Sequence, residues 1–398
     1  MKPLEGSFLS LGAGVNQLPL IDAAKARGLH VIAVDKNSGA PGFQKSDIRI
    51  LESTSEYRKI LHAMSRVPYT HVLRGVGSRS FGQAIHSTAY LAEKFKLPGN
   101  PPSAVDLYLD KKKLKSFLEA RSIPVPKSFS FPTTATKTKK KEILLDFPLV
   151  AKPASGHAKK GIRVLANEGE WKAFAKQAKP EQWILEQKVE GKEVTVLGMV
   201  LSGKFHLLSL TDKITTSEPP FIEIAHISPS SSIEFSGELK MLCQAIIRHT
   251  GIVHGPFVAE FKITDGGECV LIEAAPEVGG EFLADELLKQ HFSYSYFDDL
   301  LSVLIGEKPK LKFLQIGQKE RSAIFFALSS QQEKTVKSHP ILALESHETL
   351  FFQKELLPLG TSLIGKEGNQ RRDFVFGVST SEKIKAEDWV RSLLQRMN

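Results

Sequence analysis

Two glutamates, Glu260 and Glu273, lie in neighbouring segments at a spacing that would place them opposite each other. The segments 256–264 and 269–274 are short and rich in apolar residues, and Gly266-Gly267 lies between them. This pattern predicts a β-hairpin, because a two-residue loop of positive-φ residues matches the twist of the flanking strands. In the register that such a loop sets, the two glutamates pair, with Cβ atoms about 5 Å apart.

Two carboxylates held this close repel each other unless a cation lies between them. Mg²⁺ fits, because it takes hard oxygen ligands and is often bound by one or two carboxylates together with phosphate oxygens of a nucleotide. Lys262 would share the face of Glu260, since side chains alternate along a strand, and could contact a phosphate beside the metal. The alternative is a surface hairpin with Glu–Lys pairs, but the apolar neighbours favour burial of at least one face: Phe257, Phe261, Leu271 and Ile272.

Two further lysines precede this hairpin in settings that suit phosphate binding. Lys152 ends an apolar strand and is followed by a loop that contains Ser155 and Gly156. Such a loop brings backbone N–H groups close to phosphate oxygens, although no P-loop sequence follows. Lys111 follows the N-cap residue Asp110, and a cation in the first helical turn is unfavourable without a nearby anion. The alternative is a solvated basic helix face formed by Lys111, Lys112, Lys113 and Lys115.

Two acidic residues on the next predicted strands share one explanation, a bound nucleotide. Glu186 lies on the strand 183–187, and Glu193 begins the strand 193–200. The backbone between them would bind the adenine edge, and Glu193 would bind the ribose hydroxyls. For each residue taken alone, a solvent-facing strand glutamate is the alternative.

The first 35 residues predict the opening of a doubly wound parallel sheet: a strand, a glycine turn, a helix and a second strand. Gly12, Gly14 and Asp35 resemble a dinucleotide-binding fingerprint. Gln17, however, stands at the third glycine position, where close helix–strand packing needs a small residue. We therefore expect a Rossmann-like domain whose turn closes a substrate cleft, and NAD binding is disfavoured.

These features occur in an order that resembles the ATP-grasp superfamily. The order is D-K-x₃-K, a strand with Lys152 and its glycine loop, E-x-x-V-x-G-x-E, and Glu260 and Glu273 across a hairpin. The resemblance covers about the first 310 residues. Within it, the segments 211–230 and 259–275 look most like bacterial L-amino-acid ligases and related carboxylate–amine ligases of the carbamoyl-phosphate-synthase-like type.

The resemblance implies an α/β and α+β chain of three domains. A Rossmann-like pre-ATP-grasp domain would cover 1–110. An ATP-grasp domain would cover 111–310, with a glycine-rich lid subdomain at about 125–190. A small α+β domain would cover 311–398, where no residue shows evident chemistry.

The resemblance also implies roles for individual residues. The nucleotide would be bound by Lys111, Lys152, Ser155, Gly156, Glu186, Gln187, Val189, Glu193 and Lys262. Mg²⁺, or Mn²⁺ in its place, would be bound by Glu260 and Glu273. The substrates would contact Lys213, Glu223, His226, Glu277, Gly279 and Gly280. The residues nearest the reaction would be Lys152, Lys262 and Glu277.

Two positions depart from the family pattern. Ala275 replaces an asparagine that often completes metal binding two residues after the second glutamate. Glu277 stands where the pattern E-x-x-x-R places an arginine, which normally steadies the acyl phosphate or the substrate carboxylate. An acid there would repel both groups. Three explanations stay open: the substrate is cationic, another residue replaces the arginine, or the activity is lost.

The resemblance implies an ATP-dependent ligase that couples a carboxylate to an amine, with amino-acid-like substrates. ATP would phosphorylate the carboxylate, the amine would attack the acyl phosphate, and ADP and phosphate would be released. Catalysis would rest on positioning and charge neutralisation, without a protein nucleophile. The alternatives are a bicarbonate-using ATP-grasp carboxylase and a nucleotide-binding pseudoenzyme.

The composition agrees with a globular protein of two or three domains, since 41% of its 398 residues are hydrophobic and 24% are charged. No segment has the pattern of a membrane span or signal peptide, and Cys243 and Cys269 give no disulfide framework, so we expect a cytoplasmic protein. The net charge of +9 suits anionic partners. Its lysine clusters lack interleaved aromatic residues, which favours small-molecule substrates over nucleic acid. The oligomeric state stays open, with a homodimer as one option.

Overall fold

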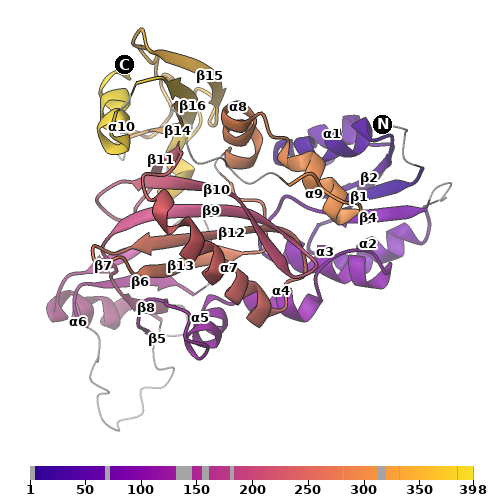
Figure 1. Ribbon diagram of the computed structural model, residues 1–398, viewed down its shortest axis with the longest axis horizontal. Coiled ribbons are helices and arrows are strands. Elements are labelled where there is room, and N and C mark those ends of the chain that lie inside the picture. The colour runs from indigo at the N-terminus through magenta and orange to yellow at the C-terminus, as the bar shows by residue number, and fades with distance from the viewer. Residues whose placement is uncertain are drawn as a thin grey trace.

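The computed structural model describes residues 5–67, 72–130, 146–154, 161–179, 183–280, 282–311, 320–330, 332–382 and 384–397. Its strands form three sheets, two of four strands and one of eight (Figure 1). The predicted α/β and α+β fold class, with a Rossmann-like N-terminal part, is confirmed. The predicted phosphate-loop residues Ser155 and Gly156 lie outside the described residues.

The N-terminal part is a parallel sheet of order β3-β2-β1-β4. Its strands and helices are β1 (Ser7–Leu11), β2 (His30–Asp35), β3 (Ile48–Leu51), β4 (Leu73–Gly77), α1 (Leu18–Ala26), α2 (Tyr57–Met64) and α3 (Gln83–Lys94). Every residue of β1 is buried, as expected of a central strand covered on both faces. α9 (Tyr296–Leu304) returns from much later in the chain and packs against α1.

Side chains of the chain itself fill the turn after β1. Asp35 accepts a hydrogen bond from the backbone N–H of Ala13 at 2.9 Å, and the buried Gln17 donates one to the Arg79 carbonyl at 2.8 Å. A Cβ added to Gly12 would lie 2.9 Å from the Gln17 side chain. Gln17 thus occupies space next to the turn where a dinucleotide fingerprint has only glycine. This packing favours the Rossmann-like interpretation over NAD binding.

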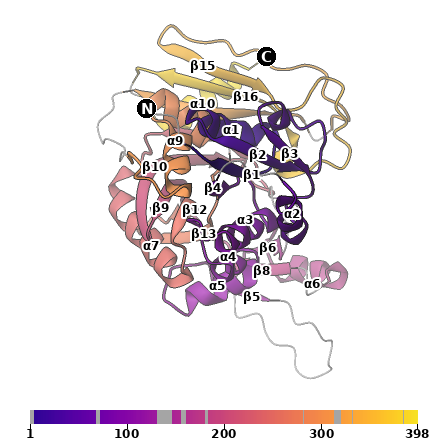
Figure 2. The ribbon, with the colours of Figure 1, turned by 90° about the vertical axis from the view of Figure 1, so that its right-hand side faces the viewer.

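A second sheet, of order β5-β8-β6-β7, is antiparallel. It contains β5 (Ser128–Ser130), β6 (Leu149–Pro153), β7 (Arg163–Leu165) and β8 (Trp183–Gln187), and it is covered by α6 (Glu168–Gln177). The helices α4 (Pro102–Tyr108) and α5 (Lys111–Glu119) precede it in the chain. Figures 1 and 2 place this sheet at the opposite end of the molecule from β15 and β16, the strands nearest the C-terminus.

The third sheet has the order β13-β12-β9-β10-β11-β14-β16-β15. Its strands are β9 (Lys192–Leu201), β10 (Lys204–Thr215), β11 (Glu223–Ser228), β12 (His254–Ile263), β13 (Cys269–Ala275), β14 (Arg321–Leu328), β15 (Glu348–Glu355) and β16 (Arg372–Thr380). α7 (Ser236–Thr250) packs on one face, where its apolar residues and those of β12 form a common core. Cys243 and Cys269 are both buried in that core, as predicted.

The hairpin of β12 and β13 pairs Glu260 with Glu273, as the sequence predicts, but by a different route. The predicted two-residue loop is wrong. Thr264 donates its N–H to the Glu268 carbonyl at 3.0 Å, so the loop has three residues and ends at Gly267, whose φ is 80°. This is the turn that ends in a left-handed glycine. Next to the loop the strand register therefore differs by one residue from the predicted register, and a bulge at Ile272 restores the predicted register before Glu273.

Side chains alternate along β12 as predicted. Phe257 and Phe261 are completely buried against α7, whereas Glu260 and Lys262 lie on the opposite face of the strand and are partly exposed. The hairpin is consequently a component of the large sheet with one buried face. The surface-hairpin alternative is therefore not supported.

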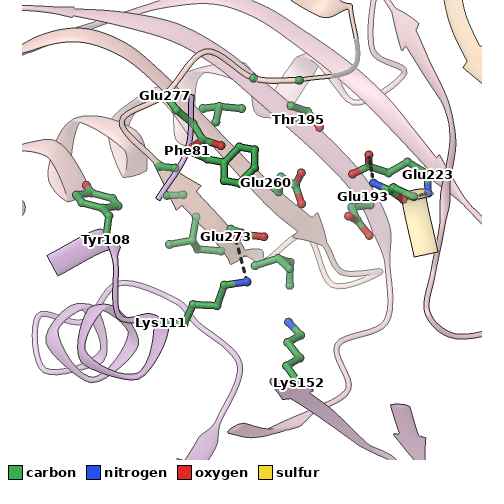
Figure 3. Close-up of a pocket in the computed structure, with 18 of the residues that line it drawn as sticks. Phe81, Tyr108, Lys111, Lys152, Glu193, Thr195, Glu223, Glu260, Glu273 and Glu277 are labelled. Carbon is green, nitrogen blue, oxygen red and sulfur yellow. Dashed lines mark hydrogen bonds and ion pairs between the residues drawn. The ribbon is translucent and has the colours of Figure 1, made fainter. Parts of the chain in front are cut away.

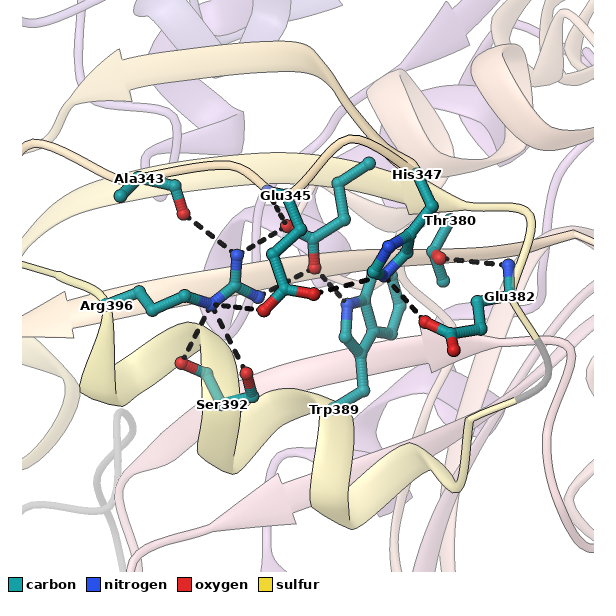
Figure 4. A network of polar contacts seen from close by, with 9 residues as sticks. Ala343, Glu345, His347, Thr380, Glu382, Trp389, Ser392 and Arg396 are labelled. Carbon is teal, nitrogen blue, oxygen red and sulfur yellow. Dashed lines mark hydrogen bonds and ion pairs between the residues drawn. The ribbon is translucent and has the colours of Figure 1, made fainter.

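The C-terminal helix is held to the large sheet by a polar network (Figure 4). Glu348 has no exposed side-chain surface and accepts hydrogen bonds from Arg396 at 2.6 Å and 2.7 Å and from Trp389 Nε1 at 2.7 Å. Both donors come from α10 (Ala386–Gln395) or the residue after it. Burial raises the pKa of Glu348, but Arg396 outweighs this effect and lowers the pKa to about 2.

We expect Glu348→Gln to lower the free energy of unfolding by about 2–3 kcal/mol at pH 7. A folded-state pKa below the ordinary 4.5 stabilises the protein above pH 4.5, and this contribution is lost as the pH falls through about 2. The difference between wild type and variant should therefore shrink in acid. Urea unfolding at pH 7 and pH 3 measures it, with the exposed Glu387→Gln on α10 as the control. An unchanged difference at both pH values would contradict the assignment.

Candidate functional site

A cavity of about 820 Å³ lies where the three sheets meet (Figure 3). The four-stranded antiparallel sheet contributes Lys152 and Glu186, and one face of the large sheet contributes Glu260 and Glu273. The N-terminal part contributes the loop 79–82, between β4 and α3. Every described residue predicted as a site residue lines this cavity except Lys213. Segments more than 200 residues apart in the chain thus form one site.

The centre of the cavity holds the paired glutamates. Lys111 Nζ lies 3.2 Å from Glu273 Oε1, and Lys213 Nζ lies 2.6 Å from Glu260 Oε2. Asp110 caps α5 by accepting hydrogen bonds from two backbone N–H groups of its first turn. The anion that Lys111 requires in that turn is therefore Glu273. Burial raises the pKa of Glu273, but Lys111 and Lys152 outweigh it and the net pKa is lowered.

Glu186 connects two lysines at the end of the cavity formed by the sheet β5-β8-β6-β7. Lys152 Nζ lies 2.7 Å from Glu186 Oε2, and Lys115 pairs with the other carboxylate oxygen. Burial raises the pKa of Glu186, yet Lys152 and Lys115 lower it overall to about 2. Burial lowers the pKa of Lys115 to about 8, against the effect of Glu186. Gln187 and Val189 follow Glu186 along the same cavity wall.

The interpretation of Lys115 as part of a solvated helix face is wrong. Its side chain is only 12% exposed and lines the cavity. The signal that could have found it is the D-K-x₃-K spacing, because residues four apart lie on the same face of a helix. Lys111 and Lys115 therefore both point toward the cavity, one to Glu273 and the other to Glu186.

Lys213 lies beneath the cavity rather than in it. Its side chain has no exposed surface, and its Nζ lies 3.1 Å from Glu193, 2.6 Å from Glu223 and 2.6 Å from Glu260. Burial lowers the pKa of Lys213, but Glu223 and Glu260 raise it well above its ordinary value. A direct substrate contact of Lys213 is therefore excluded in this conformation. The lysine instead holds together three carboxylates for which separate roles were expected.

The C-terminal part of the chain contributes residues that the sequence did not reveal. Asn369 Nδ2 donates to Glu223 Oε2 at 3.1 Å, and Arg372 Nη1 lies 3.4 Å from the same oxygen. Both residues line the cavity, and the Arg372 guanidinium lies 4.1 Å from the centre of the Phe326 ring. The expectation that residues 311–398 carry no chemistry is thus wrong. No local motif identifies these residues, because they reach the cavity only through the strand order β11-β14-β16 of the large sheet.

Glu277 lies just beyond β13, with Gly279 and Gly280 next along the cavity wall. It forms no hydrogen bond or ion pair within the part of the chain that the structure describes. Burial raises the pKa of Glu277 to about 8, and the carboxylates of Glu273 and Glu260 act in the same direction. Within the described residues, no ion pair therefore stabilises the charged form of Glu277, and its raised pKa favours the neutral acid.

We expect Glu277→Gln to stabilise the metal-free and nucleotide-free protein at alkaline pH. A carboxyl whose folded-state pKa is raised from 4.5 to about 8 favours the folded state below pH 4.5, and this advantage is lost as the pH rises through 8. The free energy of unfolding of the variant should exceed that of wild type by about 2–4 kcal/mol at pH 9 and equal it at pH 4. Thermal unfolding at both pH values measures this, with exposed Glu387→Gln as control. If the stability difference between wild type and Glu277→Gln were the same at pH 9 and pH 4, the environment assigned to Glu277 would be contradicted.

The chemistry of the donors fits a magnesium ion that is bound together with a nucleotide. No three His, Cys, Asp or Glu side chains in the described ranges are grouped so that they could hold a metal ion by themselves. Glu260 and Glu273 supply two carboxylates at directly opposite positions. Mg²⁺ is typically held by one or two carboxylates and completes its coordination with phosphate oxygens and water.

Comparison with known proteins identifies the domain around this cavity. Residues 145–285 match the family model of the ATP-grasp domain. The chain is 27% identical over 310 residues to carnosine synthase 1 of Gallus gallus. This alignment covers 70% of the present chain and 33% of the relative. The chain spans 33–61% of the length of the curated relatives it matches.

Solved structures show the same fold over the whole chain. An L-amino acid ligase from Bacillus licheniformis has a TM-score of 0.76 at 18% identity, covering 99% of this chain and 98% of that one. The biotin carboxylase domain of the Hydrogenobacter thermophilus 2-oxoglutarate carboxylase, in complex with MgADP and bicarbonate, has a TM-score of 0.70 at 14% identity, with 99% and 91% covered. Within the described residues, no helix is long and apolar enough to cross a membrane.

Proposed function

Because this chain contains an ATP-grasp domain, we propose that it is an ATP-dependent ligase that joins a carboxylate to an amine. ATP phosphorylates the carboxylate to an acyl phosphate, the amine displaces the phosphate, and ADP and phosphate leave. The substrates are amino-acid-like small molecules. Two similar proteins support this class by their names, an L-amino acid ligase and a carnosine synthase.

The single observation that carries the proposal is the arrangement of charge in the cavity. Glu260 and Glu273 face the cavity as a pair, with Lys111 at 3.2 Å from Glu273. Lys152 and Lys262 line the same cavity. Acidic ligands for a cation next to several lysines suit a polyphosphate, since the cation and the lysines both neutralise phosphate charge.

The residues of this chain divide the work along the cavity. Glu186 positions Lys152 and Lys115 at the lid end, where Gln187 and Val189 are placed to bind the adenine through their backbone. Mg²⁺, when bound by Glu260 and Glu273, supplies charge neutralisation to the transferring phosphate.

Lys111 and Lys262 line the same cavity and would neutralise charge on the transferred phosphate. Lys213 fixes Glu193, Glu223 and Glu260 relative to one another.

The test is ADP release with Mg²⁺ and ATP against a matrix of paired amino acids, with and without bicarbonate. Release that needs two amino-acid-like partners supports the ligase. Release that needs bicarbonate instead favours the carboxylase. ATP binding without release under any pairing would favour the pseudoenzyme and contradict the proposal.

A further inference from the structure

We propose that Glu277 and Phe81 form a subsite for a positively charged ammonium group of the substrate, other than the amine that reacts. The inference rests on the proposed function and names the substrate class of the same cavity. It is carried by the charge pairing of the cavity, by the position of Glu277 along it, and by an exposed aromatic ring that lines the same cavity.

Charge pairing distinguishes Glu277 from the other acids of the cavity. Each of the other glutamates that line it has an ion pair with a lysine: Glu186, Glu193, Glu223, Glu260 and Glu273. Glu277 has none within the ranges that the structure describes. Without a cation, burial favours the neutral acid, in agreement with the raised pKa of Glu277, and a cationic group brought by the ligand would stabilise the charged carboxylate.

Position separates Glu277 from the phosphate end. In Figure 3 Glu277 and Phe81 lie on one side of the Glu260–Glu273 pair, and Lys152 lies on the other. A substrate carboxylate is attracted toward the lysines and repelled by Glu277. An amino-acid-like substrate therefore lies with its carboxylate toward Lys111 and Lys152 and with an ammonium group toward Glu277.

Phe81 adds a surface that suits a cation. It lies in the loop between β4 and α3 of the N-terminal sheet, and it is 57% exposed although it lines the cavity. Phe81 thus contributes apolar surface to a ligand-sized cavity. An aromatic face attracts an ammonium group, and a carboxylate that lines the same cavity supplies the opposite charge. Together the two residues would accept an ammonium group and disfavour a carboxylate.

The ammonium group has two sources, the α-amine of the activated amino acid or a charged side chain, and binding measurements separate them. L-lysine, L-norleucine and Nα-acetyl-L-lysine are titrated into the full chain with Mg²⁺ and a non-hydrolysable ATP analogue. Tighter binding of lysine than of norleucine identifies a side-chain ammonium. Weaker binding of the acetylated probe than of lysine identifies the α-ammonium. Equal binding of all three probes would overturn the proposal.

Substitutions test whether the preference depends on this subsite. We expect Glu277→Gln to weaken binding of the preferred probe by about 10- to 100-fold and to abolish the preference. Phe81→Leu should weaken it by about 2- to 5-fold, because the aromatic face is lost and an apolar group remains. Exposed Glu387→Gln is the matched control and should change nothing. A preference that survives Glu277→Gln would overturn the proposal. The proposal would also be overturned if Glu277→Gln changed only the Mg²⁺ concentration that binding requires.

Failure of the proposed function gives a different result. In that case no pairing supports ADP release, whereas the binding preference and its loss in Glu277→Gln are still measurable. Conversely, turnover that is as efficient with substrates lacking a second ammonium group, in wild type and in Glu277→Gln, would retain the ligase and exclude the subsite.

Discussion

Glu273→Gln is expected to reduce Mg²⁺- and ATP-dependent ADP release by about 100-fold or more while leaving the fold intact. The change removes one of the two carboxylates that face each other across the hairpin, together with the partner of Lys111 at 3.2 Å. Groups that stabilise developing charge in an active site typically contribute 10²–10³ in rate. Because Glu273 is 55% exposed to the cavity, its replacement by an amide of the same shape should cost little stability.

The matched control for this variant is Glu268→Gln. Glu268 is exposed at the loop end of the same hairpin, five residues before Glu273. ADP release is measured over a range of Mg²⁺ concentrations, and circular dichroism checks the fold. Full turnover of Glu273→Gln at the wild-type Mg²⁺ requirement would remove the metal assignment.

Lys213→Met is expected to lower the free energy of unfolding by about 3–5 kcal/mol. The lysine side chain has no exposed surface and lies within 3.1 Å of three carboxylates, those of Glu193, Glu223 and Glu260. Without its charge, three acids would remain close together in a mostly buried region. They would repel one another, and each would lose the ion pair that offsets its removal from water.

Two further variants separate charge from packing at this position. Lys204→Met, at the exposed start of the same strand, should change stability by less than about 0.5 kcal/mol. Lys213→Arg keeps the charge and should retain more stability than Lys213→Met. Urea unfolding at neutral pH measures all three. If the methionine variant were as stable as wild type, the three carboxylates would not depend on Lys213.

The sequence predicted the pairing of Glu260 with Glu273 correctly, although the reasoning contained two errors that cancel. The loop has three residues rather than two, which shifts the register by one. The bulge at Ile272 shifts it back. A Gly-Gly pair is compatible with both loop lengths, and no residue type within a strand reliably predicts a bulge. Pattern reasoning therefore located the site without describing the backbone that makes it.

Other features of the site were beyond sequence reasoning because they depend on contacts between distant segments. Lys213 could be assigned to the acceptor pocket by resemblance, but only the pairing of β9, β10 and β12 shows that it binds Glu193 and Glu260. Arg372 lies 149 residues from Glu223 and reaches it across β14. The Rossmann-like part, in contrast, follows from local periodicity and was predicted correctly.

The continuity of the large sheet has a consequence for dividing this protein into fragments. β14 pairs with β11 through four residues, and β16 and β15 continue the same sheet. A fragment ending near residue 310 would therefore leave β11 as a bare sheet edge, with unpaired N–H and C=O groups that invite aggregation. It would also lack Asn369 and Arg372, which hold Glu223. A fragment that retains the complete cavity thus extends at least through β16.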